Sequence, residues 1–99
     1  MFPVYRYEKK IIEICRKLKV KRLDLVGSAS RKDFNPKHSD IDLLVEFEGS
    51  DHLFDRYFQL KADLEQGLGR HVDLIQNKAV KNPYVRKALE KDRMPIYGT

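Results

Sequence analysis

The segment Ile41–Phe47, with the sequence IDLLVEF, constrains the fold of this 99-residue chain more than any other stretch. Its residues alternate with a period of two, which predicts a β-strand. The apolar face of this strand comprises Ile41, Leu43, Val45 and Phe47. Asp40 and Asp42 stand two positions apart at the start of the strand, so both are expected on the opposite face. The apolar face requires other elements to cover it.

Two amphipathic segments predict helices that can cover this face. The first spans Tyr7–Leu18. The second follows the turn EGSD, takes Ser50 or Asp51 as its cap and closes near Gly67 and Gly69. The aromatic residues of its FDRYF segment are expected to pack in the core. Its apolar stripe comprises Leu53, Tyr57, Leu60, Leu64 and Leu68.

A third helix is expected over roughly Tyr84–Lys91, because Asn82 and Pro83 form a favourable helix start. Met94-Pro95 is expected to end it. The side chains that this helix is expected to direct toward the core are Val85, Ala88 and Leu89.

Two further short strands are expected at Arg22–Val26 and His71–Ile75, the second with Asp73 on its polar face. A turn at Gly27-Ser28 follows the first, and Ser28 is a candidate cap for a helical turn in SASR. Strands that alternate with helices, without a linker or an internal repeat, predict one domain over residues 1–99. The expected fold class is α/β (α+β), a small mixed sheet with helices packed on one face.

The composition limits the partners and the compartment. Twenty Lys and Arg against fifteen Asp and Glu give a net charge of +5, which admits nucleotides, nucleic acids or acidic proteins. The basic residues are scattered and form no aromatic-rich strand or recognition helix, so nucleic-acid binding is not favoured. The single cysteine, Cys15, indicates a buried thiol in a reducing compartment. No apolar run is long enough for a signal peptide or a membrane span, so we expect a cytoplasmic protein.

Three carboxylates are expected to meet at one end of the sheet if the strands that carry Asp42 and Asp73 are neighbours. Two charges about 6 Å apart repel by roughly 2–3 kcal/mol at an effective dielectric near 20. A divalent cation removes this repulsion, and Mg²⁺ prefers a few carboxylates together with water and phosphate oxygens. Two such ions about 3.5–4 Å apart serve phosphoryl transfer. The acid cluster therefore predicts a site for magnesium and a nucleotide.

The turn after the first strand supplies groups that suit a phosphate. Gly27 lets the backbone approach a ligand closely. The Ser28 hydroxyl and the N–H groups at the start of SASR can bind phosphate oxygens, and Arg31 adds positive charge.

Other interpretations of single residues stay open. Asp40 alone could be a turn residue or a cap, whereas Asp42 is harder to explain because Asp is depleted within strands. Ser39 could cap its own turn or donate a hydrogen bond to a carboxylate. Glu46 shares the face of Asp42 but is expected at the surface.

The pattern GSASR…SDIDLLVEF…VDLI resembles the polymerase-β-type nucleotidyltransferase superfamily, whose motif is Gly-Ser, Asp-x-Asp and a third Asp on an adjacent strand. More narrowly, the short length and the ending NPYVRKALEKDRMPIYG resemble the minimal nucleotidyltransferases (MNT), small prokaryotic proteins paired with HEPN-domain partners. The resemblance spans Leu23 to Gly98. It implies the minimal nucleotidyltransferase fold.

The resemblance also implies a role for each candidate residue. The Gly27-Ser28 turn and Arg31 would bind the triphosphate of ATP. Asp40, Asp42 and Asp73 would be the catalytic carboxylates and the ligands of two Mg²⁺ ions. Asp73 would in addition help to deprotonate the acceptor hydroxyl.

The chain has no second domain to hold an acceptor, so we expect a protein acceptor with its own binding surface. By the resemblance, the protein would be an antitoxin and adenylyltransferase (AMPylase) that moves AMP from Mg·ATP to a tyrosine of a cognate HEPN RNase toxin. One alternative is a non-catalytic antitoxin that neutralises its toxin by binding alone. A second alternative is a basic nucleic-acid-binding module. No membrane partner is expected.

Overall fold

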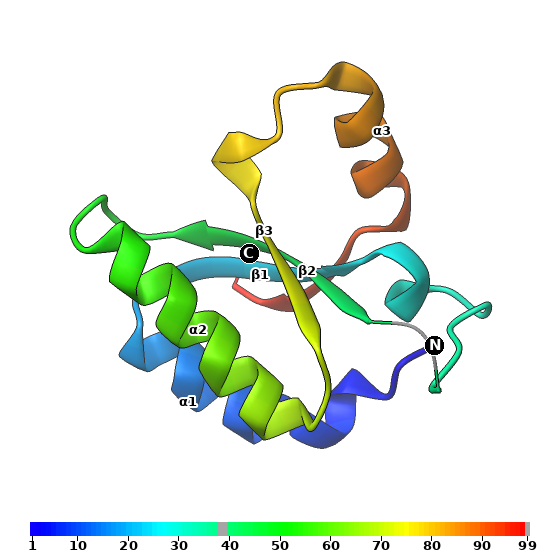
Figure 1. Ribbon diagram of the computed structural model, residues 1–99, viewed down its shortest axis with the longest axis horizontal. Helices are drawn as coiled ribbons and strands as arrows, with labels where there is room; N and C mark the ends of the chain where they lie inside the picture. Colours follow the sequence, from blue (N-terminus) through cyan, green and yellow to red (C-terminus); the bar gives the residue numbers. More distant parts are fainter. Residues whose placement is uncertain (38–39, 99) are drawn as a thin grey trace.

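The computed structural model describes residues 1–37 and 40–98, so the open question about Ser39 lies outside the described residues. Four strands form one sheet in the order β3-β2-β1-β4 (Figure 1). The strands are β1 (Val20–Val26), β2 (Ile41–Phe47), β3 (Val72–Gln76) and β4 (Met94–Tyr97). The helices are α1 (Glu8–Lys17), α2 (Leu53–Leu68) and α3 (Pro83–Asp92). Short 3₁₀ turns span Val4–Tyr7 (η1), Gly27–Ser30 (η2) and Asn77–Ala79 (η3).

The sheet is mixed, which confirms the predicted fold class. β1 pairs antiparallel with β2 and with β4, whereas β2 and β3 run parallel. A parallel pair needs a crossover, and α2 supplies it between β2 and β3. The strand β4 was not predicted, because it has only four residues and contains Pro95. As the last strand of the sheet, β4 tolerates a proline that a central strand would not.

Helices α1 and α2 pack on one face of the sheet and enclose the core (Figure 1). The alternation in β2 is as predicted for Ile41, Leu43, Val45 and Phe47, which are buried in this core, while Leu44 is buried on the other face of the sheet. Leu60, Leu64 and Leu68 contribute the buried stripe of α2, and Ile11 and Cys15 that of α1. Burial raises the pKa of the Cys15 thiol to about 12, so this side chain acts as a small apolar core residue.

The aromatic residues of α2 depart from the prediction. Phe54 and Phe58 are 75% and 52% exposed, and of the aromatics in FDRYF only Tyr57 packs against the core. Phe54 and Phe58 lie four positions apart, so they share a helix face beside the core stripe rather than on it. The buried member of this segment is Arg56, which donates hydrogen bonds to the backbone carbonyls of Leu18, Lys19, Glu48 and Asp51.

The helix caps follow the prediction in part. Asn82 caps α3, since its Oδ1 accepts hydrogen bonds from two N–H groups of the first turn. Gly69, with φ +65°, ends α2 as expected. The prediction of Ser50 or Asp51 as the cap of α2 was wrong. The helix begins after His52, which is in the left-handed region with φ +53° and makes no side-chain capping bond.

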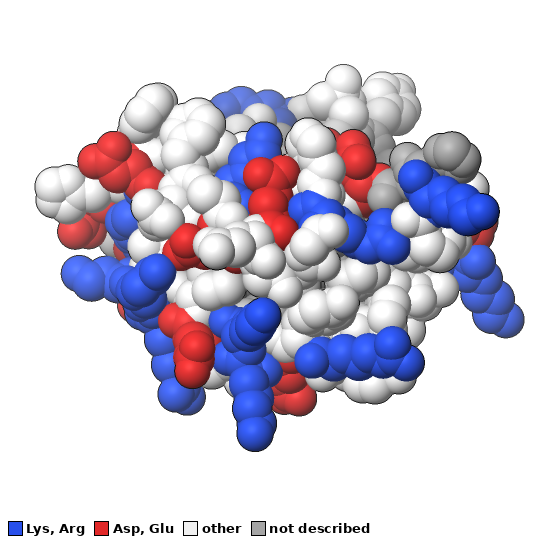
Figure 2. Space-filling view, turned by 60° about the horizontal axis from the view of Figure 1, so that its bottom comes forward, with Lys and Arg blue, Asp and Glu red and all other residues white. Residues whose placement is uncertain are grey.

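The charges on the face formed by α1 and α2 are mixed in sign. Lys and Arg side chains are interspersed with Asp and Glu across this surface (Figure 2). Lys17 of α1 and Asp63 of α2, for example, form an ion pair of 2.9 Å. This face does not show the basic stripe typical of a nucleic-acid interface. No helix in residues 1–37 and 40–98 combines the length and apolar character needed to cross a membrane.

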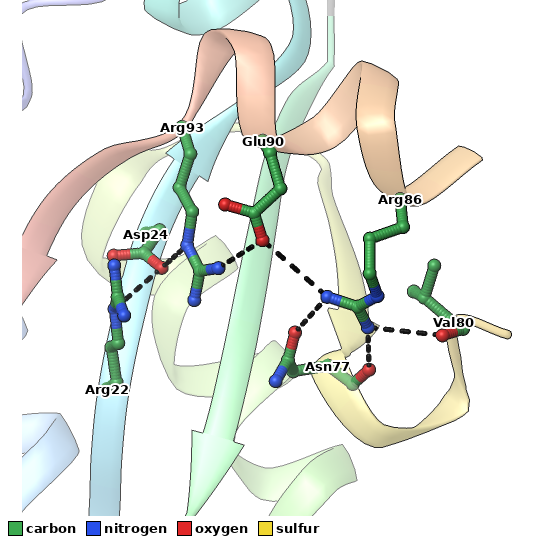
Figure 3. Close-up of polar contacts among 7 residues, drawn as sticks. All are labelled: Arg22, Asp24, Asn77, Val80, Arg86, Glu90 and Arg93. Atoms are coloured by element: carbon green, nitrogen blue, oxygen red, sulfur yellow. Dashed lines mark hydrogen bonds and ion pairs between the residues drawn. The ribbon is translucent and has the colours of Figure 1, made fainter. Parts of the chain in front are cut away.

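Helix α3 lies on the opposite face of the sheet from α1 and α2, so the prediction that the helices pack on one face holds for α1 and α2 only (Figure 1). The prediction that its apolar residues face the core was wrong, because Val85 and Ala88 are exposed and Leu89 is only half-buried. The helix instead contacts the sheet through ion pairs. Asp24 of β1 is fully buried on this face and pairs with Arg93 at the end of α3 and with Arg22 (Figure 3).

The ion pairs continue along the inner side of α3 (Figure 3). Arg93 Nη1 donates to Glu90 Oε1 at 2.6 Å, and Glu90 pairs with Arg86 at 3.6 Å. Arg86 then donates to the Asn77 side chain and backbone and to the Val80 carbonyl, at 2.7–3.1 Å. This network ties α3 both to β1 and to the segment after β3.

Replacing Asp24 with Ala is expected to lower the free energy of unfolding by about 3–5 kcal/mol. The change removes the buried carboxylate that pairs with both Arg22 and Arg93, and leaves the Arg93 guanidinium, which is 12% exposed, with Glu90 as its remaining carboxylate partner among the described residues. Urea unfolding followed by circular dichroism measures the effect. Glu13→Ala, at an exposed position of α1, is the control and should change stability by less than about 0.5 kcal/mol. Equal effects of the two changes would contradict a structural role for the Asp24 network.

Candidate active site

The parallel register of β2 and β3 places two of the predicted carboxylates side by side. Asp42 and Asp73 are directly paired residues in neighbouring strands, and such strands lie about 4.8 Å apart. Both side chains lie on the sheet face opposite the core, since their strand neighbours Ile41, Leu43, Val72 and Leu74 are buried. The expectation that the two strands are neighbours is therefore confirmed.

The third acid, Asp40, lies just before β2 and close enough to act on Asp42. The pKa of Asp42 is raised above its usual value, first because the carboxyl is partly buried and then because Asp73 and Asp40 repel its charge. Arg31 acts in the opposite sense and lowers this pKa. These four groups thus form one electrostatic unit at the start of β2.

The carboxylates do not form a closed metal site as they stand. Among residues 1–37 and 40–98, no three His, Cys, Asp or Glu side chains are arranged to enclose a metal ion. Ionised carboxylates repel one another, so a cation between them stabilises their closer approach. Carboxylate oxygens are nevertheless the ligands that Mg²⁺ prefers, and the pairing of Asp42 with Asp73 places two of them on neighbouring strands. The donor set therefore fits a small divalent cation.

Gly27 lies directly over the Asp42 carboxylate. Val26, at the end of β1, is paired with Asp42, so the chain turns immediately above this side chain. Gly27 has φ +65°, and a Cβ at this position would lie 2.5 Å from Asp42 Oδ2. Only glycine combines this backbone conformation with room for the carboxylate.

The turn itself differs from the prediction. The 3₁₀ turn begins at Gly27, so Ser28 lies within it and makes no capping bond. Ser30 instead donates its hydroxyl hydrogen bond to the Gly27 carbonyl at 2.8 Å. Ser28 stays half-buried, beside the glycine that covers Asp42.

Arg31 is held by two carboxylates whose role was not predicted from the sequence. Its Nε and Nη2 donate to Asp33 at 2.9 and 3.3 Å, and its Nη1 donates to Asp92 at 2.7 Å. These hydrogen bonds raise the pKa of Arg31 further and lower that of Asp33. Asp33, two residues after Arg31, could have been suspected from the sequence. Asp92 could not, because it comes from the end of α3, 61 positions away.

The candidate site and α3 share one face of the sheet. Asp24, which holds the end of α3, is paired with Leu44, and Val26 is paired with Asp42, so these side chains point the same way. The ion pair between Arg31 and Asp92 makes a second connection from α3 to the turn at Gly27. The arrangement places acids, a glycine turn and a tethered guanidinium around one open area of the surface, which suits a metal-bound phosphate.

Comparison with known families gives a match over most of the chain. A family model described as "Nucleotidyltransferase domain" matches residues 8–96. "Putative protein adenylyltransferase MJ1379" of Methanocaldococcus jannaschii is 42% identical over 90 residues, which cover 90% of this chain and 87% of that protein. "Putative protein adenylyltransferase MJ0128" of the same organism is 43% identical over 90 residues, with the same coverage of each chain.

Solved structures agree with this match. One described as a "putative minimal nucleotidyltransferase" superposes with a TM-score of 0.78 at 26% identity and covers 96% of each chain. A toxin–antitoxin crystal structure with AMP-PNP has a TM-score of 0.72 at 24% identity, and covers 93% of this chain and 73% of that one. A complex of tri-AMPylated Shewanella oneidensis HEPN toxin with MNT antitoxin has a TM-score of 0.68 at 23% identity, and covers 96% and 72%. At this identity, the last two show a shared fold alone.

Gly27→Ala is expected to destabilise the protein and to displace the Asp42 carboxylate. A left-handed conformation costs a non-glycine residue about 1–2 kcal/mol, and the contact with Asp42 Oδ2 adds about 1–3 kcal/mol by overpacking. Chemical denaturation measures the combined effect.

Gly69→Ala is the matched control, because Gly69 also has φ +65° but a methyl group at this position would meet nothing within 4 Å. This change should lower stability by the backbone contribution alone, about 1–2 kcal/mol. If Gly27→Ala costs no more than Gly69→Ala, the close approach of Gly27 to Asp42 is not a constraint on the site.

Asp42→Asn is expected to stabilise the metal-free protein at pH 7 by on the order of 1 kcal/mol, because it removes a partly buried charge and its repulsion from Asp73 and Asp40. The pKa of Asp42 is higher in the folded than in the unfolded state, so folding favours its protonated form. The contribution of Asp42 to wild-type stability therefore falls as the pH rises through the interval between these two pKa values, and the advantage of Asp42→Asn disappears below it. Thermal unfolding from pH 3 to 8 measures the difference.

Millimolar Mg²⁺ should raise the melting temperature of the wild type and leave that of Asp42→Asn unchanged. Glu48→Gln, at an exposed position after β2, is the control and should behave as the wild type in both tests. A wild-type melting temperature that does not respond to Mg²⁺ would contradict a metal site at Asp42.

Proposed function

We propose that this chain, which belongs to the nucleotidyltransferase domain family, transfers AMP from Mg·ATP to a tyrosine hydroxyl of a HEPN-domain partner protein. By this modification it silences the partner as an antitoxin silences its toxin, in the cytoplasm. The observation that carries the proposal is the register of Asp42 with Asp73 beneath the Gly27 turn.

Asp40, Asp42 and Asp73 would hold the metal. They provide hard oxygen ligands on one face of the sheet, and their mutual repulsion is relieved only by positive charge. When bound, Mg²⁺ neutralises charge on the triphosphate and on the departing pyrophosphate. The partial burial of Asp42 by Gly27 fixes the position of one ligand, while Asp40 and Asp73 are exposed and accessible to a large substrate.

The turn at Gly27-Ser28 and Arg31 would bind the triphosphate. The guanidinium of an arginine has five N–H donors, and within the described part of the chain Arg31 uses three in bonds to Asp33 and Asp92. Two donors remain for phosphate oxygens. Because the guanidinium is already oriented by its carboxylate partners, little conformational entropy is lost when it binds an anion.

The transfer step is a displacement at the α-phosphorus of ATP. The tyrosine oxygen forms the new P–O bond, the bond from the α-phosphorus to the bridging oxygen breaks, and pyrophosphate leaves. Asp73, exposed at the edge of the acid cluster, would accept the proton of the hydroxyl.

The identity of the acceptor is supported by the relatives. The two curated relatives from Methanocaldococcus jannaschii carry the name of protein adenylyltransferases. A solved structure of the same fold contains an AMPylated HEPN toxin, and another contains a nucleotide analogue. The exposure of Asp40 and Asp73 leaves the site open to a hydroxyl carried by another protein.

Incubation of the chain with Mg·ATP and the HEPN-domain protein of the same genome is expected to add AMP to a tyrosine of that protein, detected by intact-mass and peptide mass spectrometry. Asp42→Asn should reduce the adduct by at least about 100-fold, since it removes a metal ligand, and chelation of Mg²⁺ should abolish it.

Glu46→Gln is the matched control, because Glu46 lies on the same face of β2 four residues further along, and it should leave the adduct unchanged. An adduct that is equal in Asp42→Asn and the wild type would refute the proposed site. Neutralisation of the toxin without any adduct would instead identify an antitoxin that acts by binding alone.

A further inference from the structure

Helix α3 is amphipathic, but its charged side faces the protein and its apolar side faces solvent. Its inner side carries Arg86 and Glu90, which take part in the ion-pair network with Arg93 (Figure 3). Its outer side carries Tyr84 and Val85, which are 84% and 47% exposed, and no residue of the helix is buried. A surface helix normally turns its apolar side toward the protein.

The exposed apolar residues form one continuous surface. At 100° per residue, Tyr84, Val85 and Ala88 fall within an arc of about 100°, on the side opposite Arg86 and Glu90. We call these three residues the α3 stripe. Exposed apolar side chains that share one helix face are a feature of association sites.

The geometry points to the α3 stripe as the docking surface for the protein that accepts the nucleotidyl group, an inference that rests on the function proposed above. The partner is identified by the charges that border the stripe. Lys87 and Lys91 are exposed along one edge of the stripe, and Lys81 is exposed just before the helix. The complementary partner surface is an apolar strip flanked by Asp or Glu side chains.

The position of α3 connects this surface to the candidate site. Asp92, at the end of the helix, accepts a hydrogen bond from Arg31 Nη1 at 2.7 Å. With a rise of about 1.5 Å per residue, the stripe lies roughly 6–12 Å along the helix axis from Asp92. A protein bound on the stripe therefore borders the acid cluster and can present a hydroxyl to it.

A second exposed apolar pair is a poor alternative. Phe54 and Phe58 of α2 contact each other with ring centroids 4.8 Å apart, and both are exposed. They lie on the other face of the sheet, near the end of β2 at Phe47. Five residues of β2, about 17 Å, separate that end from Asp42, and the acids lie on the opposite face of the sheet, so an acceptor bound there is poorly placed to present a hydroxyl to them.

The test uses the purified HEPN-domain protein of the same genome as the probe and the double change Val85→Asp and Ala88→Asp in the full chain. The double change would place two carboxylates of the stripe against a partner surface that is itself flanked by Asp or Glu side chains. We expect the Kd for the probe, measured by calorimetry, to rise at least about 30-fold and the KM for the probe to rise with it. ATP affinity and the melting temperature should stay within about twofold and about 2 °C of the wild type, because both positions are exposed.

Two further variants make the test specific. Lys91→Glu should weaken binding of the probe by about 3–10-fold, and the effect should shrink at high salt because it is electrostatic. Phe54→Asp, a charged change in the other exposed apolar pair, should leave Kd and KM unchanged. Weakening by Phe54→Asp without weakening by the double variant would overturn the inference.

The outcomes separate this inference from the proposed function. If the wild type transfers AMP to the probe and the double variant does so with an unchanged KM, the docking surface is refuted and the function stands. If the double variant loses binding but the wild type transfers no AMP, the function fails and the docking surface stands. A wild-type dimer that the double variant dissociates, seen by analytical ultracentrifugation without the probe, would assign the stripe to a second copy of this chain and overturn the inference.

Discussion

The parallel register of β2 and β3 places Asp42 and Asp73 side by side. The rest of the site depends on this electrostatic constraint. The same pairing that buries Ile41 and Leu43 in the core brings the two carboxylates together on the other face. The fold thus supplies the free energy that overcomes their repulsion, and the pKa of Asp42 is raised first by burial and then by this repulsion. A site of this kind gains most from a cation, because positive charge removes the repulsion that folding has already imposed, and a bound cation can in turn attract a phosphate.

Helix α3 is attached to the face that carries these acids mainly by charge pairs, and the apolar residues Val26 and Leu44 are also buried on this face. Asp24 is buried in β1 and bound by Arg22 and Arg93, and the pairs continue to Glu90 and Arg86. A helix held by ion pairs on its inner side has its apolar side free for another protein. Since Asp92 of the same helix also orients Arg31, the attachment of α3, the anion site and the exposed stripe are parts of one arrangement.

Local sequence patterns predicted those features that depend on nearest neighbours. The alternation in Ile41–Phe47 and the cap at Asn82 are as expected, because strand faces and capping bonds are decided within a few residues. The fourth strand, the exposure of Phe54 and Phe58 and the orientation of α3 were not predicted. Each of these three features depends on contacts with a segment that is distant in the chain. The apolar residues of α3 have the spacing of a helix that packs on a core. The ion pair of Arg93 with the buried Asp24 of β1 instead holds the charged side of the helix against the sheet.

The sequence by itself determined the chemical groups of the site and the strands that carry them: two aspartates at the start of β2, a third in β3, and a glycine turn after β1. Their spacing along the chain is sufficient because strand periodicity is a local property of the backbone. Only the tertiary structure decided that Asp42 lies beneath Gly27, that Asp92 holds Arg31, and that α3 turns its apolar residues to solvent. Each of these outcomes depends on contacts between residues far apart in the chain. The packing of the whole fold decides where a charge is desolvated and where an apolar side chain is buried.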